Sequence, residues 1–378
     1  MPLWKIITGE YPPQPGGVSD YTRLVALGLA ARGNRVLVWA PGPADGALTD
    51  GPIEVRRIRD GFGPRSLGAL GRGISDAGPG EILVQYVPQA FGLRGMNLPL
   101  CLWLFARRRD RVTVMFHEVT VGLAWRQPMR LNIMGAAHHA MAFVLTRAAR
   151  RCFVGAAAWE TRLRLLSPQG AAISWLPVPS NVPVVEDATG VSAIRKRMVS
   201  NGGLILGHFG TARETWIADR VAEAAPTVLR GHPDSALLLA GRESVYLRSR
   251  VLAHAPELHQ RVHATGPLGP VELSKCLSAC DVMLQPYDDG VSTRRGTVMA
   301  ALAHRRPVVT TAGFCTEPLW GESGAVALVP ARDAATIGAA VSRLLDDHRE
   351  RERLGAAAGE LYAERFDIRH TIDALCET

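Results

Sequence analysis

Two series of short apolar runs, each alternating with helical segments, constrain the fold of this chain more than any other feature of its sequence. The first series comprises residues 3–8, 35–40, 53–58, 81–86, 111–116, 150–154 and 173–176. The second comprises residues 203–208, 236–240, 261–264, 281–285, 307–311 and 325–329. Apolar runs of this length, separated by helical patterns, are typical of parallel strands covered by helices on both faces. The sequence therefore predicts two α/β domains, each built on a doubly wound sheet.

A proline-rich stretch separates the two series. Residues 176–190, LPVPSNVPVVEDATG, contain three prolines and are typical of an extended linker. We expect an N-terminal domain over residues 1–178, a linker over 179–190 and a C-terminal domain over 191–355. The charged, amphipathic end of the chain, residues 356–378, is expected to form helices that pack back across the linker.

The loops that follow the strands are the candidate sites, because doubly wound domains bind ligands at the carboxyl ends of their strands, here in a cleft between the two domains. After the first strand, Gly16 and Gly17 directly precede a helix expected over residues 18–32. The N–H groups and the positive end of a helix suit an anion. A tight strand–helix turn explains the two glycines equally well.

Two further strand ends carry polar residues. His117 and Glu118 follow the strand at 111–116, where they would face the cleft. A histidine that caps the next helix is the alternative. After the strand at 203–208, Gly210 lies in a turn and Arg213 stands at a helix start, an arrangement that suits a diphosphate. A surface ion pair of Arg213 with a nearby glutamate is the alternative.

The longest candidate loop follows the strand at 281–285 and reads PYDDGVSTRRG. Ser292, Thr293 and the N–H groups near Gly290 predict a second helix start that can receive an anion, and Arg294 and Arg295 add positive charge.

Acidic residues open the same loop. Asp288 and Asp289 are expected to meet sugar hydroxyls or to cap the turn. A third metal ligand is missing nearby, so no metal site is predicted. The fingerprints GxGxxG, GxxxxGK[ST], GxSxG and HExxH are absent from the sequence. Glycines, arginines and hydroxyls together indicate a negatively charged, polyhydroxylated ligand.

The positive charge is concentrated in the first half. Residues 1–178 carry 21 Lys and Arg against 11 Asp and Glu, whereas the whole chain carries 43 against 35. Such a surface favours an anionic partner, such as a membrane, a lipid phosphate or a nucleic acid, although an arginine-rich composition alone would also produce it. A nucleic-acid partner is not expected, because no recognition motif and no interleaving of aromatic and basic residues is present.

Six cysteines are scattered along the chain without the spacing of a zinc site, and no signal peptide is recognised at the start. We therefore expect reduced thiols, a cytoplasmic location and no metal. The longest apolar run, residues 98–106, is shorter than the roughly 20 residues that a membrane span needs.

The ordered motifs resemble those of the retaining family-4 glycosyltransferases, members of the group 1 glycosyl transferases with the GT-B fold. The segments that carry the resemblance are TGEYPPQPGGVSDY, VTVMFHEV, LGHFGTAR, VHATGPLGP and AALAHRRPVVTT. They extend over nearly the whole chain and follow the order of that family. The resemblance implies two Rossmann-like domains facing a central cleft, with the acceptor on the N-terminal domain and the nucleotide-sugar donor on the C-terminal domain.

The chain also departs from the family pattern. The family commonly has two glutamates eight residues apart, and counting back from Pro307 places Ser292 and Ala300 there. Asp289-Gly290 would replace the first glutamate and its glycine if the loop is longer in this chain. No lysine follows Arg213 where the family commonly has a basic pair. The chain therefore resembles a divergent branch.

The resemblance implies a retaining transfer of a sugar from a UDP or GDP sugar to a hydroxyl acceptor, without a cofactor or a metal. The residues implied in catalysis are His117, Arg213 and Arg294. Those implied in donor binding are Gly16, Gly17, Gly210, Thr211, Gly266, Pro267, Leu268, Asp289, Gly290, Val291, Ser292, Thr293 and Arg295. The alternative is a nucleotide-sugar epimerase of the same architecture, or a nucleotide-sugar-binding relative with altered catalysis.

One further expectation concerns the N-terminal domain, which is expected to bind the acceptor. A lipid-linked acceptor would bring the basic domain to the inner face of a membrane, where residues 98–105, ahead of Arg107, Arg108 and Arg109, would rest on it. A buried core helix with a charged end is the alternative for this segment.

Overall fold

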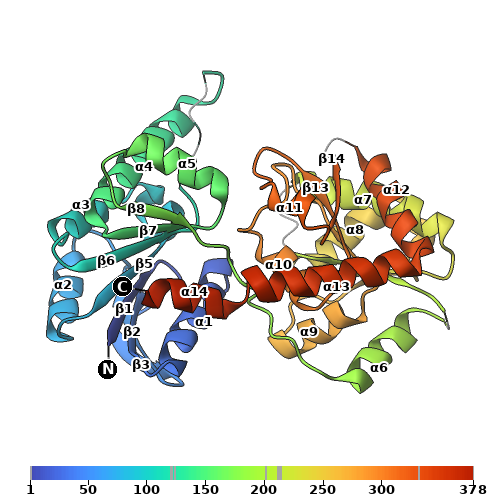
Figure 1. The fold of residues 1–378 in the computed structure, drawn as a ribbon, viewed down its shortest axis with the longest axis horizontal. Helices are drawn as coiled ribbons and strands as arrows, with labels where there is room; N and C mark the ends of the chain where they lie inside the picture. The colour runs from blue at the N-terminus through green and yellow to red at the C-terminus, as the bar shows by residue number, and fades with distance from the viewer. Residues whose placement is uncertain are drawn as a thin grey trace. The chain divides into compact units, whose positions relative to one another are not determined.

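Each series of apolar runs forms one sheet of the computed structural model, which describes residues 2–119, 122, 125–200, 202–210, 215–330 and 333–377 (Figure 1). The chain divides into two units. Unit 1 comprises Met1–Pro177 with Ile368–Thr378, and unit 2 comprises Val178–Asp367.

Within its described residues, unit 1 has an eight-stranded sheet with the order β3-β4-β2-β1-β5-β6-β7-β8. The strands are β1 (Leu3–Thr8), β2 (Arg35–Gly42), β3 (Gly46–Asp50), β4 (Ile53–Arg59), β5 (Glu81–Tyr86), β6 (Arg111–Phe116), β7 (Arg151–Val154) and β8 (Ala172–Trp175). All neighbours pair in parallel except β3 and β4. Seven of these strands coincide with the predicted runs to within two residues.

The strand that sequence reasoning missed, β3, lies at the edge of the sheet and is largely exposed. Its sequence, GALTD, lacks an apolar run because an edge strand with little buried surface needs none. It pairs antiparallel to β4 through a two-residue turn at Gly51, whose φ is 59°.

Helices and 3-10 turns of unit 1 cover this sheet. They are α1 (Gly17–Ala31), α2 (Leu67–Asp76), η1 (Pro88–Phe91), η2 (Leu93–Gly95), α3 (Leu98–Ala106), α4 (Met129–Ala148), α5 (Ala157–Leu166) and α14 (Ile368–Cys376). The core of unit 1 joins the sheet to α2, α3, α4 and α5. On α3, Leu100, Cys101 and Leu104 are buried in that core, so the segment at 98–105 is a core helix with two exposed leucines.

The last helix, α14, belongs to unit 1 because it packs on α1. The side chain of Ile372 fills the space beside Gly28, where an added Cβ would come within 2.8 Å. Asp373 pairs with Arg32, and the Arg151 guanidinium donates to the carbonyls of Ala374 (3.2 Å) and Leu375 (2.9 Å). Arginine at the last carbonyls of a helix is a favourable C-terminal cap.

Unit 2 has a six-stranded parallel sheet within its described residues, in the order β11-β10-β9-β12-β13-β14. The strands are β9 (Ile205–Phe209), β10 (Ala236–Ala240), β11 (Val262–Ala264), β12 (Val282–Gln285), β13 (Val308–Ala312) and β14 (Ala327–Pro330). One core cluster joins the sheet to α7 (Thr215–Gly231), α8 (Ser244–His254) and α12 (Ala334–Asp346). A second joins it to α9 (Pro270–Ala279), α10 (Gly296–Ala303), α11 (Leu319–Glu322) and α13 (His348–Arg365). The remaining elements are α6 (Ala188–Met198) and η3 (Pro256–Leu258).

The stretch expected as a linker lies within unit 2, and its last three residues already belong to α6. Its backbone is hydrogen-bonded there: the Ser180 N–H to the Tyr362 hydroxyl (3.2 Å) and the Val185 N–H to Ser274 Oγ (2.9 Å). The C-terminal segment is likewise divided, with α13 in unit 2 and α14 in unit 1. None of the described helices combines the length and hydropathy that a bilayer span requires.

Candidate functional site

The strand order of unit 2 brings the loops after β9 and β12 together. These strands are neighbours at the point where the winding of the sheet reverses, the usual ligand position in such sheets. At their ends Gln285 donates from Nε2 to the carbonyl of Phe209, 3.0 Å away. Gly210 follows, and a Cβ added there would lie 3.4 Å from the Thr297 side chain at the start of α10. The two loops therefore form one candidate site.

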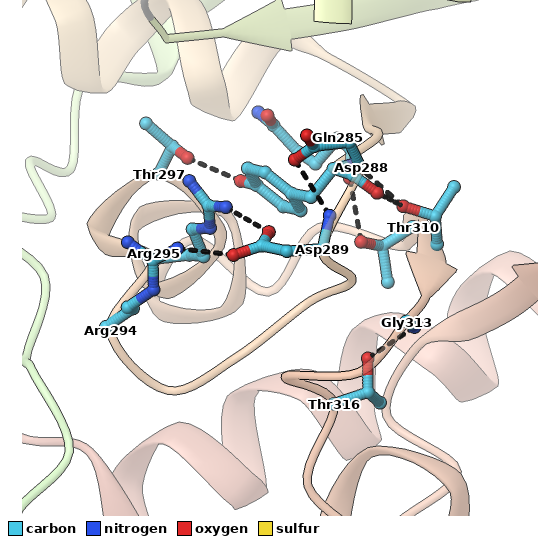
Figure 2. Close-up of polar contacts among 11 residues, drawn as sticks. Gln285, Asp288, Asp289, Arg294, Arg295, Thr297, Thr310, Gly313 and Thr316 are labelled. Atoms are coloured by element: carbon cyan, nitrogen blue, oxygen red, sulfur yellow. Dashed lines mark hydrogen bonds and ion pairs between the residues drawn. The ribbon is translucent and has the colours of Figure 1, made fainter. Parts of the chain in front are cut away.

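Asp289 organises the loop between β12 and α10, residues 286–295. Its carboxylate pairs with the guanidinium groups of both Arg294 and Arg295, as Figure 2 shows. Burial raises the pKa of the Asp289 carboxyl, but the charges of Arg295 and Arg294 outweigh this effect and hold it below its usual value. The carboxylate stays ionised at neutral pH. One negative charge therefore faces two positive charges, and the cluster keeps a net charge of about +1.

Tyr287 fixes the position of Arg295. The Arg295 guanidinium lies over the Tyr287 ring, with 4.4 Å from its central carbon to the ring centroid. The Tyr287 hydroxyl shares a hydrogen bond of 2.6 Å with Thr297 Oγ1, and the Tyr287 N–H donates to Thr311 Oγ1 at 2.7 Å. Tyr287 thus links the loop to α10 through its hydroxyl and to β13 through its backbone N–H.

The turn at Gly290 is closely packed and its N–H groups are already used. Gly290 has a φ of 87°, and a Cβ there would lie 2.2 Å from the Gly313 nitrogen. The N–H groups of Gly290, Val291 and Thr293 donate within unit 2, to the Tyr287 carbonyl, the Thr311 carbonyl and the Glu317 carboxylate. These three N–H groups are therefore not open to an anion, in contrast to the expectation from the sequence.

The backbone N–H groups that remain available to a ligand lie a few residues further along the chain. The first two N–H groups of α10, at Gly296 and Thr297, have no hydrogen-bond partner in the part of unit 2 that the structure describes. Arg295 immediately precedes them as the N-cap residue. Arg294, Arg295 and the start of α10 therefore form the positively charged part of the candidate site.

Sequence reasoning missed Glu317, which is buried beside this loop. It accepts hydrogen bonds from Thr293 Oγ1 (2.9 Å) and from Trp320 Nε1 (2.8 Å). Thr293 is thereby oriented toward the protein. The available signal was its position shortly after the apolar run at 307–311, at the carboxyl end of a strand.

The two positions at which the resemblance would place glutamates are both buried. The Ser292 side chain is fully buried, and its hydroxyl has no hydrogen-bond partner among the described residues. Ala300 is fully buried within α10. Neither residue can replace a carboxylate that faces a ligand.

The remaining residues expected on the donor side follow β9 and β11. Thr211 and Arg213 lie outside the described residues. Gly266 has a φ of 67°, and its N–H donates to Ser244 Oγ at 2.8 Å. Pro267 is exposed and Leu268 half-buried beyond it. Gly266, Pro267 and Leu268 therefore form a loop at the carboxyl end of β11, on the same edge of the sheet as the Asp289 cluster.

In unit 1 the helix start at Gly16 and Gly17 already holds a carboxylate. Glu10 Oε1 accepts the Ser19 N–H at 3.0 Å, and a Cβ added to Gly16 would lie 2.5 Å from the same oxygen. A Cβ on Gly17 would meet no atom within 4 Å. The protein's own anion occupies the position that the sequence predicted for a ligand anion.

His117 is neutral at physiological pH. Burial lowers its pKa to about 3. Its Nε2 donates to Gln85 Oε1 at 2.7 Å, and its ring meets the edge of Tyr21, with 4.7 Å between centroids. Glu118 is exposed beside it. His117 can accept a hydrogen bond from a substrate at Nδ1 but cannot supply positive charge.

A cavity of about 780 Å³ lies in unit 1. It is lined by Tyr11 and Pro13 after β1, Pro41 and Gly42 at the end of β2, Leu48 of β3 and Arg57 of β4, among others. The Arg57 guanidinium donates to the carbonyls of Pro12 and Pro41 and faces no carboxylate among the described residues. The cavity is therefore mainly apolar with one positive charge on its wall.

No group of three metal-ligating His, Cys, Asp or Glu side chains occurs among the residues that the structure describes. The prediction of a site without a metal remains a prediction.

Comparison with known structures identifies the fold. The chain superposes on a sucrose-phosphate synthase from Thermosynechococcus elongatus with a TM-score of 0.78, at 17% identity over 99% of this chain and 97% of that one. WaaG, a glycosyltransferase of lipopolysaccharide biosynthesis, gives 0.70 at 15% identity over 99% and 100%. Anabaena HepE, solved with UDP and glucose, gives 0.66 at 16% identity over 98% of each chain. The predicted GT-B fold is confirmed.

Sequence comparison finds a family similarity within the second unit. Residues 203–347 match the model of the glycosyl transferases group 1. No curated protein sequence matches the chain significantly. The matched residues include β9, β12, α10 and the Asp289 cluster. Residues 203–347 thus resemble the glycosyl transferases group 1, within a chain that has the GT-B fold throughout.

Proposed function

We propose that the protein is a retaining glycosyltransferase that moves a sugar from a nucleotide-diphosphate sugar to a hydroxyl acceptor. The observation that carries this proposal is the pair Arg294 and Arg295, held by Asp289 next to the open N–H groups of α10. Guanidinium groups beside a helix start suit the two phosphates of a nucleotide sugar. This cluster lies inside the region matched by the family model.

In the proposed reaction the bond between the anomeric carbon and the diphosphate breaks while a bond to the acceptor oxygen forms on the same face of the sugar. The acceptor proton moves to the departing phosphate oxygen, so the products are a glycoside and a nucleoside diphosphate. Arg294, Arg295 and Arg213 would stabilise the charge that develops on the leaving group, a task that preorganised cations perform well. They replace a metal in this proposal, and activity in the presence of a chelator would test that point.

We assign the nucleotide base and the donor sugar to loops that follow the strands. The loop Gly266, Pro267 and Leu268 would receive the base through backbone contacts. The sugar would meet the loop that begins at Asp289. His117 of unit 1 is proposed separately as a neutral hydrogen-bonding group for a substrate. HepE was solved with UDP-glucose, which makes UDP sugars the first donors to test.

The acceptor is proposed to enter the cavity of unit 1. Its walls of proline, tyrosine and leucine suit an apolar part of the acceptor, and Arg57 suits a polar or anionic part. A lipid-linked hydroxyl compound has both parts. The excess of basic residues in the first half of the chain supports peripheral contact of unit 1 with a membrane that carries such an acceptor.

One observation favours a second function. Ser292 and Ala300 occupy the positions of the two family glutamates, and both are buried. A nucleotide-sugar-binding relative with altered catalysis, or an epimerase of the same architecture, would fit this change. Tight binding of a nucleotide sugar without transfer to any of a broad panel of acceptors would favour that alternative.

Thermal-shift measurements with UDP, GDP and their sugars test the donor first, because binding to the native state raises the unfolding temperature. Release of nucleoside diphosphate with an acceptor panel then tests transfer, and the anomeric configuration of the product tests retention. We expect Arg213→Ala to reduce release sharply. Full activity of that variant would contradict the assigned role of Arg213.

A further inference from the structure

Helix α4 of unit 1 exposes an apolar stripe along its length. Met129, Ile133, Ala136, Ala140 and Phe143 follow one another at intervals of four and three residues, and all are exposed. This spacing places them on one face of a helix. Met129 is 77% exposed and Ile133 54%, and Trp125, just before the helix, is fully exposed. We call these residues, with Trp125, the outer stripe of α4.

The outer stripe is separate from the core. The opposite face of α4 supplies Met141, Ala142 and Leu145 to the core of unit 1, and α3 and α5 pack against the helix. The apolar residues of the outer stripe are therefore additional to those that fold the unit. Contiguous exposed apolar side chains of this kind mark an interaction surface.

The segment that carries the stripe is positively charged and has no carboxylate of its own. Between Glu118 and Glu160 the chain has no acidic residue. The exposed Arg126, Arg130, Arg147 and Arg150 have no carboxylate partner among the described residues. Arg147 lies over the ring of Phe143, 4.5 Å from its centroid. Apolar side chains flanked by unpaired arginines are typical of helices that lie on an anionic bilayer.

We propose that the outer stripe of α4, with Arg126, Arg130, Arg147 and Arg150, docks unit 1 on an anionic membrane surface. The helix would lie in the plane of the interface, with Trp125, Met129 and Ile133 among the lipid headgroups. This inference identifies the surface for the peripheral contact that we propose for unit 1, and it does not depend on the transfer reaction.

Two other occupants fit the surface less well. A second copy of the same face would oppose arginines to arginines, because a two-fold contact brings identical patches together. Nucleic acid would use the arginines but would leave the exposed methionine, isoleucine and tryptophan without a partner. The predicted membrane segment, α3, buries Leu100 and Leu104, and one of its three arginines, Arg107, pairs with Asp110.

Vesicle flotation of the full chain tests the proposal. The probes are vesicles of phosphatidylcholine alone and of phosphatidylcholine with phosphatidylglycerol. We expect binding to the anionic vesicles that weakens as salt is added. Each arginine near the surface contributes about fivefold to partitioning, so Arg126→Gln with Arg130→Gln should weaken binding roughly 25-fold. Met129→Ser with Ile133→Ser should weaken it by about tenfold or more.

Matched controls come from exposed residues elsewhere. Arg72→Gln on α2 and Val245→Ser on α8 should leave flotation unchanged. All variants should keep the unfolding temperature and the nucleotide-induced thermal shift of the parent chain, which separates a failure of docking from a failure of the proposed donor site.

Three results would overturn the proposal. The first is the absence of flotation with anionic vesicles. The second is flotation that the two stripe variants do not reduce. The third is a dimer in solution that the stripe variants dissociate, since the occupant would then be a second copy.

Discussion

The start of α1 in unit 1 and the loop before α10 in unit 2 were both predicted as anion sites, and each holds a carboxylate of the chain itself. At α1, Glu10 accepts a backbone N–H and lies against Gly16. Before α10, Asp289 pairs with two guanidinium groups. The two regions differ in the charge that remains after this pairing. Glu10 more than offsets the partial positive charge of a helix end, which amounts to about half an elementary charge, whereas Asp289 sets one negative charge against the two guanidinium groups that it pairs with.

This comparison explains why the second region is the stronger candidate for a diphosphate. A ligand at α1 must displace Glu10 or bind beside it. A ligand at α10 finds two arginines in place, together with the N–H groups of Gly296 and Thr297. A glycine pair at a helix start is therefore weaker evidence for an anion site than arginines that pair with a buried carboxylate.

The largest effect is expected from Arg294→Ala combined with Arg295→Ala. The double variant removes both cations from the leaving group, and the loss of such a donor typically lowers kcat by about 10²–10³. Nucleoside diphosphate release measures this. Arg72→Ala, on the surface of unit 1, is the control. Activity within a few-fold of the parent would show that the cluster has only a structural role.

A smaller effect, on stability, is expected from Gly290→Ala. The new methyl group would collide with the Gly313 backbone, and φ is 87°, so the free energy of unfolding should fall by about 3 kcal/mol. Gly17→Ala is the matched control in the other region, because its Cβ meets open space, and it should change stability by less than about 0.5 kcal/mol. Denaturant unfolding compares the two.

Gly17 also tests the role of the α1 region in catalysis. If Gly17→Val lowers turnover while the unfolding midpoint stays unchanged, the glycine serves the donor. A variant that unfolds instead would show that the loop is only a turn.

A moderate gain in anion affinity is expected from Asp289→Asn. The amide removes the Asp289 charge from both guanidinium groups, so pyrophosphate and nucleoside diphosphates should bind about tenfold more tightly. Isothermal titration measures the affinity, and circular dichroism checks the fold. Weaker binding by a folded variant would show that Asp289 contacts the ligand directly or positions the arginines for it.

The smallest effect is expected from Glu10→Gln. The amide oxygen can still accept a hydrogen bond from the Ser19 N–H. It no longer places a negative charge at the positive end of α1, so the free energy of unfolding should fall by about 0.5–1 kcal/mol. Anion affinity should rise only slightly, because no arginine is held there. A rise as large as that of Asp289→Asn would remove the distinction between the two regions.

Much of the architecture follows from the sequence because buried parallel strands need nearly continuous apolar runs. Thirteen predicted runs correspond to strands of the two sheets. The edge strand β3 was not predicted, because burial does not dictate which residues it contains. The end of the chain was expected to pack back across the linker. Its particular contact in unit 1, Ile372 of α14 against Gly28, joins residues more than 300 apart and could not be identified from the sequence.

The candidate site was less accessible to sequence reasoning. The positions of Arg294, Arg295 and Asp289 in a loop after a strand could be identified, but loops have no periodicity that fixes which side chains meet. Glu317 comes within reach of Thr293 only because β12 and β13 are neighbours in the sheet.

The sequence by itself determined the two doubly wound sheets and the carboxyl ends of the strands at which ligands are expected, because apolar periodicity encodes burial along a strand. Only the tertiary structure decided which charges those edges present. Glu10 lies at Gly16 and Asp289 lies between two arginines because the backbone folds each loop back on itself, and electrostatic pairing depends on distances in space rather than on order along the chain.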